Sequence, residues 1–127
     1  MKKIIGALSL LVMIFLFQQN ASAQTSNSSL LRHIVIITFK DDARVDSIKA
    51  LDNLYTQLSK NAVVKDFEMG ANVSPRDSGI VKHVYVTSFA SKDDMDSYRK
   101  LPEYQNLFKT SLPISSDVTV VDYWTNK

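Results

Sequence analysis

The chain has 127 residues, with 15 lysines and arginines against 13 aspartates and glutamates, and it contains no cysteine. Two lysines near the N-terminus account for the formal charge of +2, so the rest of the chain is neutral overall and lacks the basic excess of a nucleic-acid-binding protein. The absence of cysteine excludes disulfide bonds and a bacterial lipoprotein anchor.

The N-terminal segment has the order of parts found in secretory signal peptides. Two lysines precede an apolar run at residues 4–17, and a small-residue Ala-Ser-Ala sequence ends at Ala23. The apolar run is shorter than the roughly 20 residues of a membrane-spanning helix, although an uncleaved N-terminal anchor is the alternative. We therefore expect residues 1–23 to be a signal peptide and residues 24–30 a flexible tether. The mature protein would be periplasmic or secreted, with no stable membrane span.

From residue 31 onward, hydrophobic periodicity predicts the elements. Residues 31–40 (LRHIVIITFK) are rich in β-branched side chains and predict a first strand. Residues 42–61 carry apolar side chains three or four positions apart, which predicts an amphipathic helix. Residues 64–73 predict a second strand, in which Gly70 indicates a bulge or a close approach of another backbone.

The second half of the chain repeats this order. A turn sequence at residues 74–79 (SPRDSG) leads to a predicted third strand at residues 81–89. Ser91 begins a capping box that opens a helical region, and Pro102 starts the second part of that region. Residues 117–124 predict a fourth strand, so the expected order of elements is βαββαβ.

This order predicts a ferredoxin-like α+β fold, with both helical regions on one face of a four-stranded antiparallel sheet. Residues of the first strand alternate between the two faces, so His33 points to the helices while Ile34 and Ile36 point away from them. An apolar face without helices needs another cover. We expect a second copy of the chain to supply it, in a twofold homodimer whose two sheets pack into a barrel.

The segments RHIVIITFKDD, DFEMGANVS, KHVYVTSFASKDDMDSYRKLPEYQ and VVDYW lie in the predicted strands and the second helical region. Together they resemble the stress-responsive dimeric α/β-barrel (Dabb) family, over one domain at residues 31–124. The resemblance implies a dimeric α/β barrel. It leaves the activity open, because this family includes stress-associated proteins and a cofactor-free plant polyketide cyclase, and similar barrels are cofactor-free monooxygenases.

The helix break at residues 101–104 bears on whether the chain is an enzyme. In the family this break typically reads His-Pro-x-His, whereas here it reads Leu-Pro-Glu-Tyr. By resemblance, Tyr98 matches the family's tyrosine, and Tyr104 stands where the cyclase has its catalytic histidine. The pKa of a tyrosine, about 10, would have to fall by about 3 units for it to act as a base near pH 7. The replacement favours a binding protein over a cofactor-free cyclase/lyase-like or monooxygenase-like enzyme, in which His83 would be the base and Tyr98 would position the substrate.

The two histidines of the predicted domain match the strand histidines of the family and face the helices. The first and third strands run antiparallel, so His33 and His83 should lie at opposite ends of the sheet, although both could border one cavity. Hydrogen-bonded structural histidines are the alternative, and simple core packing is the alternative for each tyrosine. No phosphate-binding loop, Ser-His-Asp order or metal-binding motif occurs in the sequence, so we expect neither a cofactor nor a metal. The residues expected to line one pocket for a small hydrophobic molecule are His33, Tyr55, His83, Tyr85, Tyr98, Tyr104 and Phe108.

Overall fold

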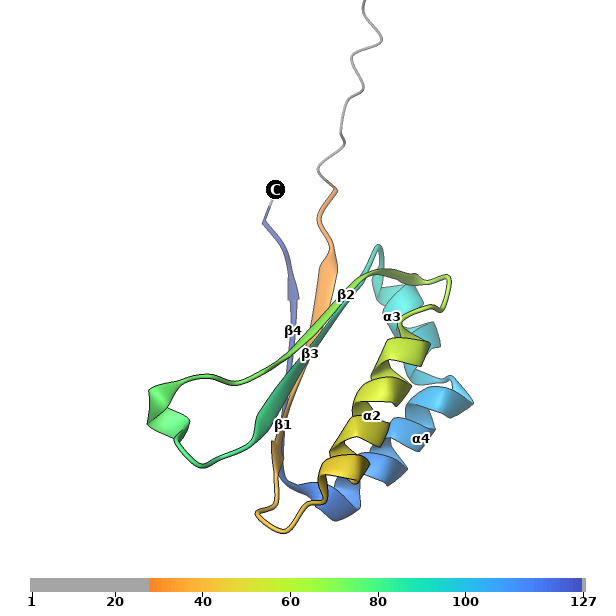
Figure 1. Ribbon diagram of the computed structural model, residues 1–127. Coiled ribbons are helices and arrows are strands. Elements are labelled where there is room, and N and C mark those ends of the chain that lie inside the picture. The colour runs from red at the N-terminus through yellow and green to blue at the C-terminus, as the bar shows by residue number, and fades with distance from the viewer. Residues whose placement is uncertain (1–27, 127) are drawn as a thin grey trace, which may run out of the picture.

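The computed structural model describes residues 28–126, so the predicted signal peptide lies outside the described residues. Four strands form one antiparallel sheet in the order β2-β3-β1-β4. Figure 1 shows all three α-helices on one face of this sheet, which confirms the ferredoxin-like α+β fold. The elements are β1 (Leu31–Phe39), α2 (Val45–Leu58), β2 (Val64–Ala71), β3 (Lys82–Phe89), α3 (Lys92–Arg99), α4 (Pro102–Ser111) and β4 (Ser115–Trp124), with short 3₁₀ turns at Pro75–Asp77 and Leu112–Ile114.

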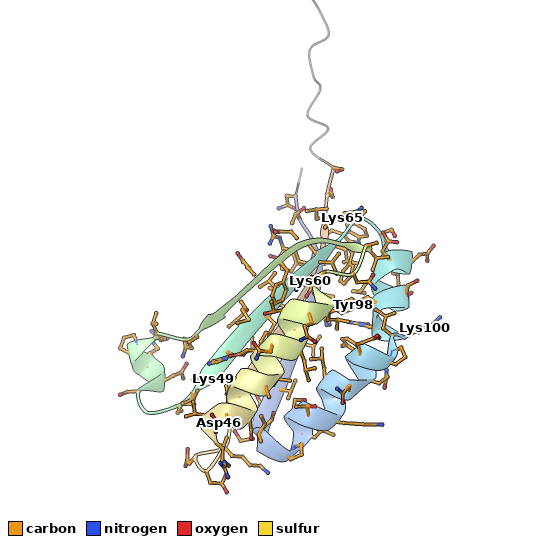
Figure 2. All side chains as sticks on the ribbon, turned by 45° about the vertical axis from the view of Figure 1, so that its right-hand side comes forward. Asp46, Lys49, Lys60, Lys65, Tyr98 and Lys100 are labelled. Carbon is orange, nitrogen blue, oxygen red and sulfur yellow. The ribbon has the colours of Figure 1, made fainter. Side chains whose placement is uncertain are left out.

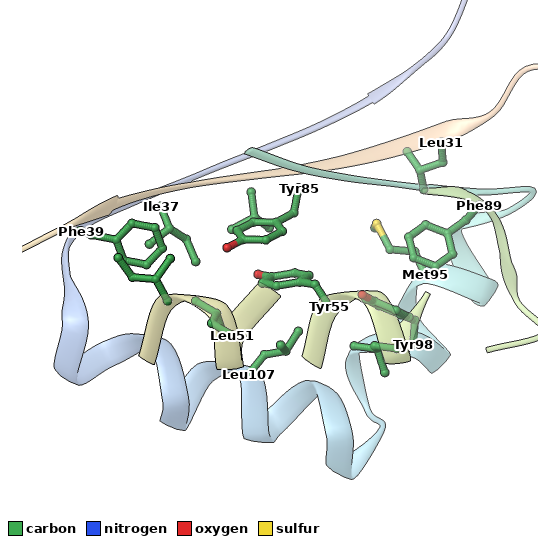
Figure 3. Close-up of a cluster of buried hydrophobic side chains, with 13 residues drawn as sticks. Leu31, Ile37, Phe39, Leu51, Tyr55, Tyr85, Phe89, Met95, Tyr98 and Leu107 are labelled. Atoms are coloured by element: carbon green, nitrogen blue, oxygen red, sulfur yellow. The ribbon is translucent and has the colours of Figure 1, made fainter. Parts of the chain in front are cut away.

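The core lies between the sheet and the helices. Every second residue of β1 is buried from Leu31 to Phe39, as the two-residue period of a strand requires. The helix α2 buries one stripe against these residues, while Asp46 and Lys49 on its other positions are exposed (Figure 2). Figure 3 shows the aromatic part of the core, with the rings of Tyr55 and Tyr85 at its centre. The buried residues of the α2 stripe are Ile48, Leu51, Tyr55 and Leu58.

The opposite face of the sheet has no helix over it within residues 28–126. Ile34 and Ile36 of β1 are partly exposed on this face, where they pair with Val86 and Val84 of β3. On the other side of β1, Ile34 pairs with Val121 of β4, which is 46% exposed. The predicted apolar face without helices is therefore present. We name it the bare face. Among the helices of residues 28–126, none is long and apolar enough to cross a membrane.

The interruption between α3 and α4 is a helix end followed by a new helix start. The hydroxyl oxygen of Ser91 accepts a hydrogen bond from the backbone N–H of Asp94 at 3.1 Å and caps the start of α3. Leu101 is extended, with φ −61° and ψ 139°, as residues before proline usually are. Pro102 then occupies the first turn of α4, where its missing N–H costs no helical hydrogen bond.

Two details differ from the sequence-based expectations. Gly70 is not at a bulge, because it pairs in register with Val84 while the irregularity lies between Val64 and Asp66. A Cβ added at Gly70 would also meet no atom within 4 Å, so no backbone approaches it closely in the single chain. Phe108 does not point into the core but is 56% exposed, because α4 turns Tyr104 and Leu107 inward and carries the next position outward.

Candidate functional site

His33 and His83 lie at opposite ends of the sheet, as the antiparallel order predicts. His33 of β1 pairs with Thr87 of β3, and His83 of β3 pairs with Ile37 of β1. The two histidines are thus four residues apart along the strands, or roughly 13 Å at the usual rise of a strand. Each has its own carboxylate partner, so the structure contains two separate polar clusters.

The first cluster joins α2 to β3. The Oδ1 atom of Asp52 lies 2.9 Å from Nδ1 of His83 and accepts a hydrogen bond from the hydroxyl of Tyr85 at 2.7 Å. The side chains of His83 and Asp52 are 19% and 16% exposed, so both remain in contact with solvent-accessible space. The ring of Phe39 stands edge-on to the His83 ring at a centroid distance of 5.2 Å and holds it from the other side.

A cavity of about 630 Å³ opens beside this first cluster. Its volume is in the range of small-molecule binding sites, about 300–1,000 Å³. Asp52 and His83 form part of its wall, together with two lysines and a further aspartate, and the rest is largely apolar. The other lining residues are Phe39, Lys40, Asp41, Ala43, Val45, Ile48, Lys49, Gly79 and Val81.

The second cluster ties β1, α3 and β4 together around His33. The Oδ1 atom of Asp122 lies 2.6 Å from Nδ1 of His33, and its Oδ2 atom accepts a hydrogen bond from Arg99 at 2.7 Å. The hydroxyl of Tyr104 is 3.5 Å from Nε2 of His33, which is a long contact. His33 is only 2% exposed, so it is a structural histidine of the core rather than part of a cavity wall.

Burial lowers the pKa of His33 from its ordinary value of 6.5, while the hydrogen bond and charge of Asp122 oppose this shift. The unfolded chain therefore binds this proton more readily, and the free energy of unfolding should decrease as the pH falls below about 6.5. One proton contributes a slope of at most about 1.4 kcal/mol per pH unit. Urea unfolding at fixed protein concentration between pH 8 and pH 5 should show a steeper loss for the wild type than for His33→Gln. Equal slopes in the two proteins would contradict this expectation.

The tyrosines belong mainly to the core. Tyr55 and Tyr85 stack at a centroid distance of 3.7 Å, and Tyr98 packs against Phe89 at 5.0 Å, at the other end of the core (Figure 3). Burial raises the pKa of Tyr98 to about 12, against the opposing effect of its hydrogen bond with Thr87. Burial also raises the pKa of Tyr104, which moves it further from the range in which a tyrosine could accept a proton near pH 7.

The seven residues expected in one pocket do not share a cavity. Tyr55, Tyr104 and Phe108 line a small cleft of about 90 Å³ between α4 and β4, and His83 lines the larger cavity. Tyr85 lies behind His83 and reaches Asp52, whereas His33 and Tyr98 are enclosed in the core. The stacked rings of Tyr55 and Tyr85 fill the middle of the space between sheet and helices in the single chain, and the shared pocket stays a prediction.

Three polar residues of these clusters were not found from the sequence: Asp52, Arg99 and Asp122. Asp52 follows the buried Leu51 and lies one turn after Ile48, at the border of the apolar stripe of α2. A carboxylate at the border of the apolar stripe, on a helix predicted to cover the strand of His83, is the sequence feature that could have identified Asp52 as a partner of His83. Asp122 lies directly opposite His33 in the register of β1 and β4, which only the strand pairing reveals.

The sheet order, the helices on one face and the bare opposite face define a domain of the ferredoxin-like class. The stress-responsive A/B barrel domain matches residues 31–125, so the chain belongs to this family. A stress-response A/B barrel domain-containing protein of Arabidopsis thaliana is 29% identical over 80% of this chain, and the match spans only 39% of the length of that relative. A second protein of the same description from Arabidopsis thaliana is 27% identical over 76% of this chain and 86% of its own length.

Solved structures of similar fold include a dimeric ferredoxin-like protein of unknown function from Thermobifida fusca. It has a TM-score of 0.67 and 17% identity, with 78% of this chain and 93% of the other covered. The hydroxynitrile lyase from Passiflora edulis has a TM-score of 0.69 and 23% identity, covering 79% of this chain and 96% of the enzyme. At these identities the similarity establishes the fold, while the function has to be argued from the site.

Proposed function

We propose that this protein is an exported homodimer that binds a small hydrophobic molecule in the cavity beside His83. The observation that carries the proposal is the cavity itself, which combines apolar side chains with several charged groups and the hydrogen-bonded pair of Asp52 and His83. Apolar pockets with a few well-placed polar groups are the usual form of small-molecule sites. The bare face supports the homodimer, as does the dimeric protein of similar fold from Thermobifida fusca.

Native mass spectrometry of the protein purified from its own host tests the binding proposal. We expect a retained ligand of defined mass, which dissociates on denaturation. Ala43→Trp should eliminate it, because Ala43 lines the cavity and the indole ring would occupy the space. Ala50→Trp is the matched control, since Ala50 is an exposed residue of α2 outside the cavity wall. Equal ligand retention by both variants would place the bound molecule elsewhere.

A cofactor-free enzyme is the second candidate, favoured by the carboxylate–histidine pair of Asp52 and His83 at the cavity wall. A carboxylate that orients a histidine is a common arrangement around a general base. Tyr98 is not placed to position a substrate for His83, because Tyr98 is buried against Phe89 and does not line this cavity. If the protein is an enzyme, the residues that handle the substrate are therefore to be sought around His83 and Asp52.

Export has a direct test at the N-terminus. Because the small-residue sequence ends at Ala23, cleavage after this residue should give a mature protein that begins at Gln24. N-terminal sequencing of the protein recovered from the periplasm or the medium checks this. A recovered protein that keeps the apolar run at residues 4–17 would show that the segment is an anchor and not a cleaved signal.

A further inference from the structure

We infer that Asp52 and Tyr85 fix His83 as a hydrogen-bond acceptor towards the cavity, so that the cavity selects an apolar molecule carrying a weakly acidic hydroxyl group, such as a phenol. This inference rests on the proposed binding function and adds the chemical class of the ligand. It also assigns a positioning role to Asp52, which acts through its hydrogen bond with His83.

The hydrogen bonds around Asp52 determine which nitrogen of His83 carries the proton. The hydroxyl of Tyr85 donates to Oδ1 of Asp52 at 2.7 Å, and Nδ1 of His83 lies 2.9 Å from the same oxygen. A carboxylate oxygen that already accepts one hydrogen bond can only accept a second, so Nδ1 of His83 is the donor. Burial raises the pKa of Tyr85, which keeps its hydroxyl protonated and donating.

The other ring nitrogen of His83 is then an acceptor when the imidazole is neutral. Nε2 of His83 has no hydrogen-bond partner among residues 28–126, although the ring forms part of the cavity wall. The hydrogen bond to Asp52 and the edge contact with Phe39 hold the ring in one orientation. The cavity therefore presents a fixed acceptor, and a bound molecule satisfies it best with an O–H or N–H group.

The charges of the cavity wall distinguish between these donors. Lys49 projects from α2 on the side of the β2–β3 hairpin (Figure 2), and Lys40 also lines the cavity. Asp41 and Asp52 also line the wall and balance the formal charge of the lysines, but Asp52 already accepts hydrogen bonds from Tyr85 and His83. The two ammonium groups can stabilise an oxygen that gains negative charge. In a weakly acidic hydroxyl the O–H bond can break and an N–H bond form on His83, with the electron pair left on the oxygen. Asp52 stabilises the imidazolium that results.

A matched pair of probes tests this inference: 4-nitrophenol and its methyl ether, 4-nitroanisole. The two molecules have the same ring and nitro group, and only the phenol can donate a hydrogen bond. In isothermal titration calorimetry we expect the wild-type protein to bind the phenol about 10-fold more tightly than the methyl ether. This ratio corresponds to a difference of about 1.4 kcal/mol in binding free energy. His83→Phe should bind both probes with equal affinity, because the acceptor is lost while the apolar wall is kept.

Asp52→Asn tests the positioning role. Its amide can donate to Nδ1 and so favour the tautomer with the proton on Nε2, which removes the acceptor and the preference for the phenol. ¹⁵N chemical shifts of His83 in the wild-type protein should show the Nδ1–H tautomer, a readout that does not depend on how well any variant folds. A proton on Nε2 in the neutral wild-type ring would overturn the assignment.

The outcomes separate this inference from the proposed function. If the wild type binds both probes equally, the cavity binds small apolar molecules and the selection for a hydroxyl group is wrong. If the Asp52→Asn protein keeps the full preference, the positioning role of Asp52 is wrong. If neither probe binds at millimolar concentration, and no ligand is retained by the protein from its own host, the proposed function fails and the inference fails with it.

Discussion

Replacing Ile36 with aspartate is expected to turn the proposed homodimer into a folded monomer. Ile36 of the inner strand β1 lies on the bare face of the sheet, next to Val84 of β3 and Thr119 of β4. If a second copy covers this face, the substitution buries an unpaired carboxylate, which costs several kcal/mol. In the monomer the same carboxylate faces water, so the fold should persist. Size-exclusion chromatography with light scattering should give half the wild-type mass, together with an unchanged circular dichroism spectrum.

Val73→Asp is the control for the dimer experiment. It introduces the same charge at a residue that is 92% exposed and lies beyond the end of β2. This variant should keep the mass of the wild-type dimer. If Ile36→Asp keeps it as well, the bare face is not the dimer interface, and another surface or another partner covers it.

Asp122→Ala is expected to lower the free energy of unfolding by roughly 1–3 kcal/mol, the cost of leaving a buried hydrogen-bond donor unsatisfied. The carboxylate of Asp122 receives hydrogen bonds from the buried His33 and from Arg99, and so connects three elements of the fold. After the substitution, the guanidinium of Arg99 remains 3.2 Å from Nδ1 of His33, but it is itself a donor and cannot accept the hydrogen bond that Asp122 accepted. Urea unfolding at a fixed protomer concentration measures the change, since the stability of a dimer depends on concentration.

Asp96→Ala is the matched control for the stability experiment. Asp96 pairs with Lys92 one turn away on α3, where both side chains are exposed. Exposed ion pairs contribute little because water screens them, so this variant should unfold close to the wild-type urea concentration. A wild-type midpoint for Asp122→Ala would show that the cluster around His33 does not stabilise the fold.

The sequence was sufficient for the fold because its signals are local. The alternation along β1 assigns each residue to a face without knowledge of its neighbours in space, and His33 was placed correctly towards the helices. Pro102 marked the start of α4 by its own covalent structure. Phe108 was misplaced because two adjacent apolar residues on a helix cannot both point to the centre of the core, and the sequence does not say which one does.

The candidate site depends on contacts between distant segments. Asp52 meets His83 across 31 positions of the chain, and Asp122 meets His33 across 89 positions. Whether such pairs form depends on the rotation of α2 about its axis and on the register of β4, and neither follows from periodicity. The stacked pair of Tyr55 and Tyr85 is of the same kind. This pair divides the space between sheet and helices, so a list of aromatic residues could not predict two cavities instead of one.

The position of β1 in the sheet has a consequence for how the chain acquires its structure. Leu31 pairs with Phe89 on one side and with Trp124 on the other, so the strand that leaves the ribosome first needs the last strand to complete its hydrogen bonds. Pairings between such distant residues make folding slow compared with that of helical bundles, because a long loop has to close before any contact stabilises it. We therefore expect the sheet to assemble in one cooperative step that requires residues 115–124, and a fragment without them should not fold stably.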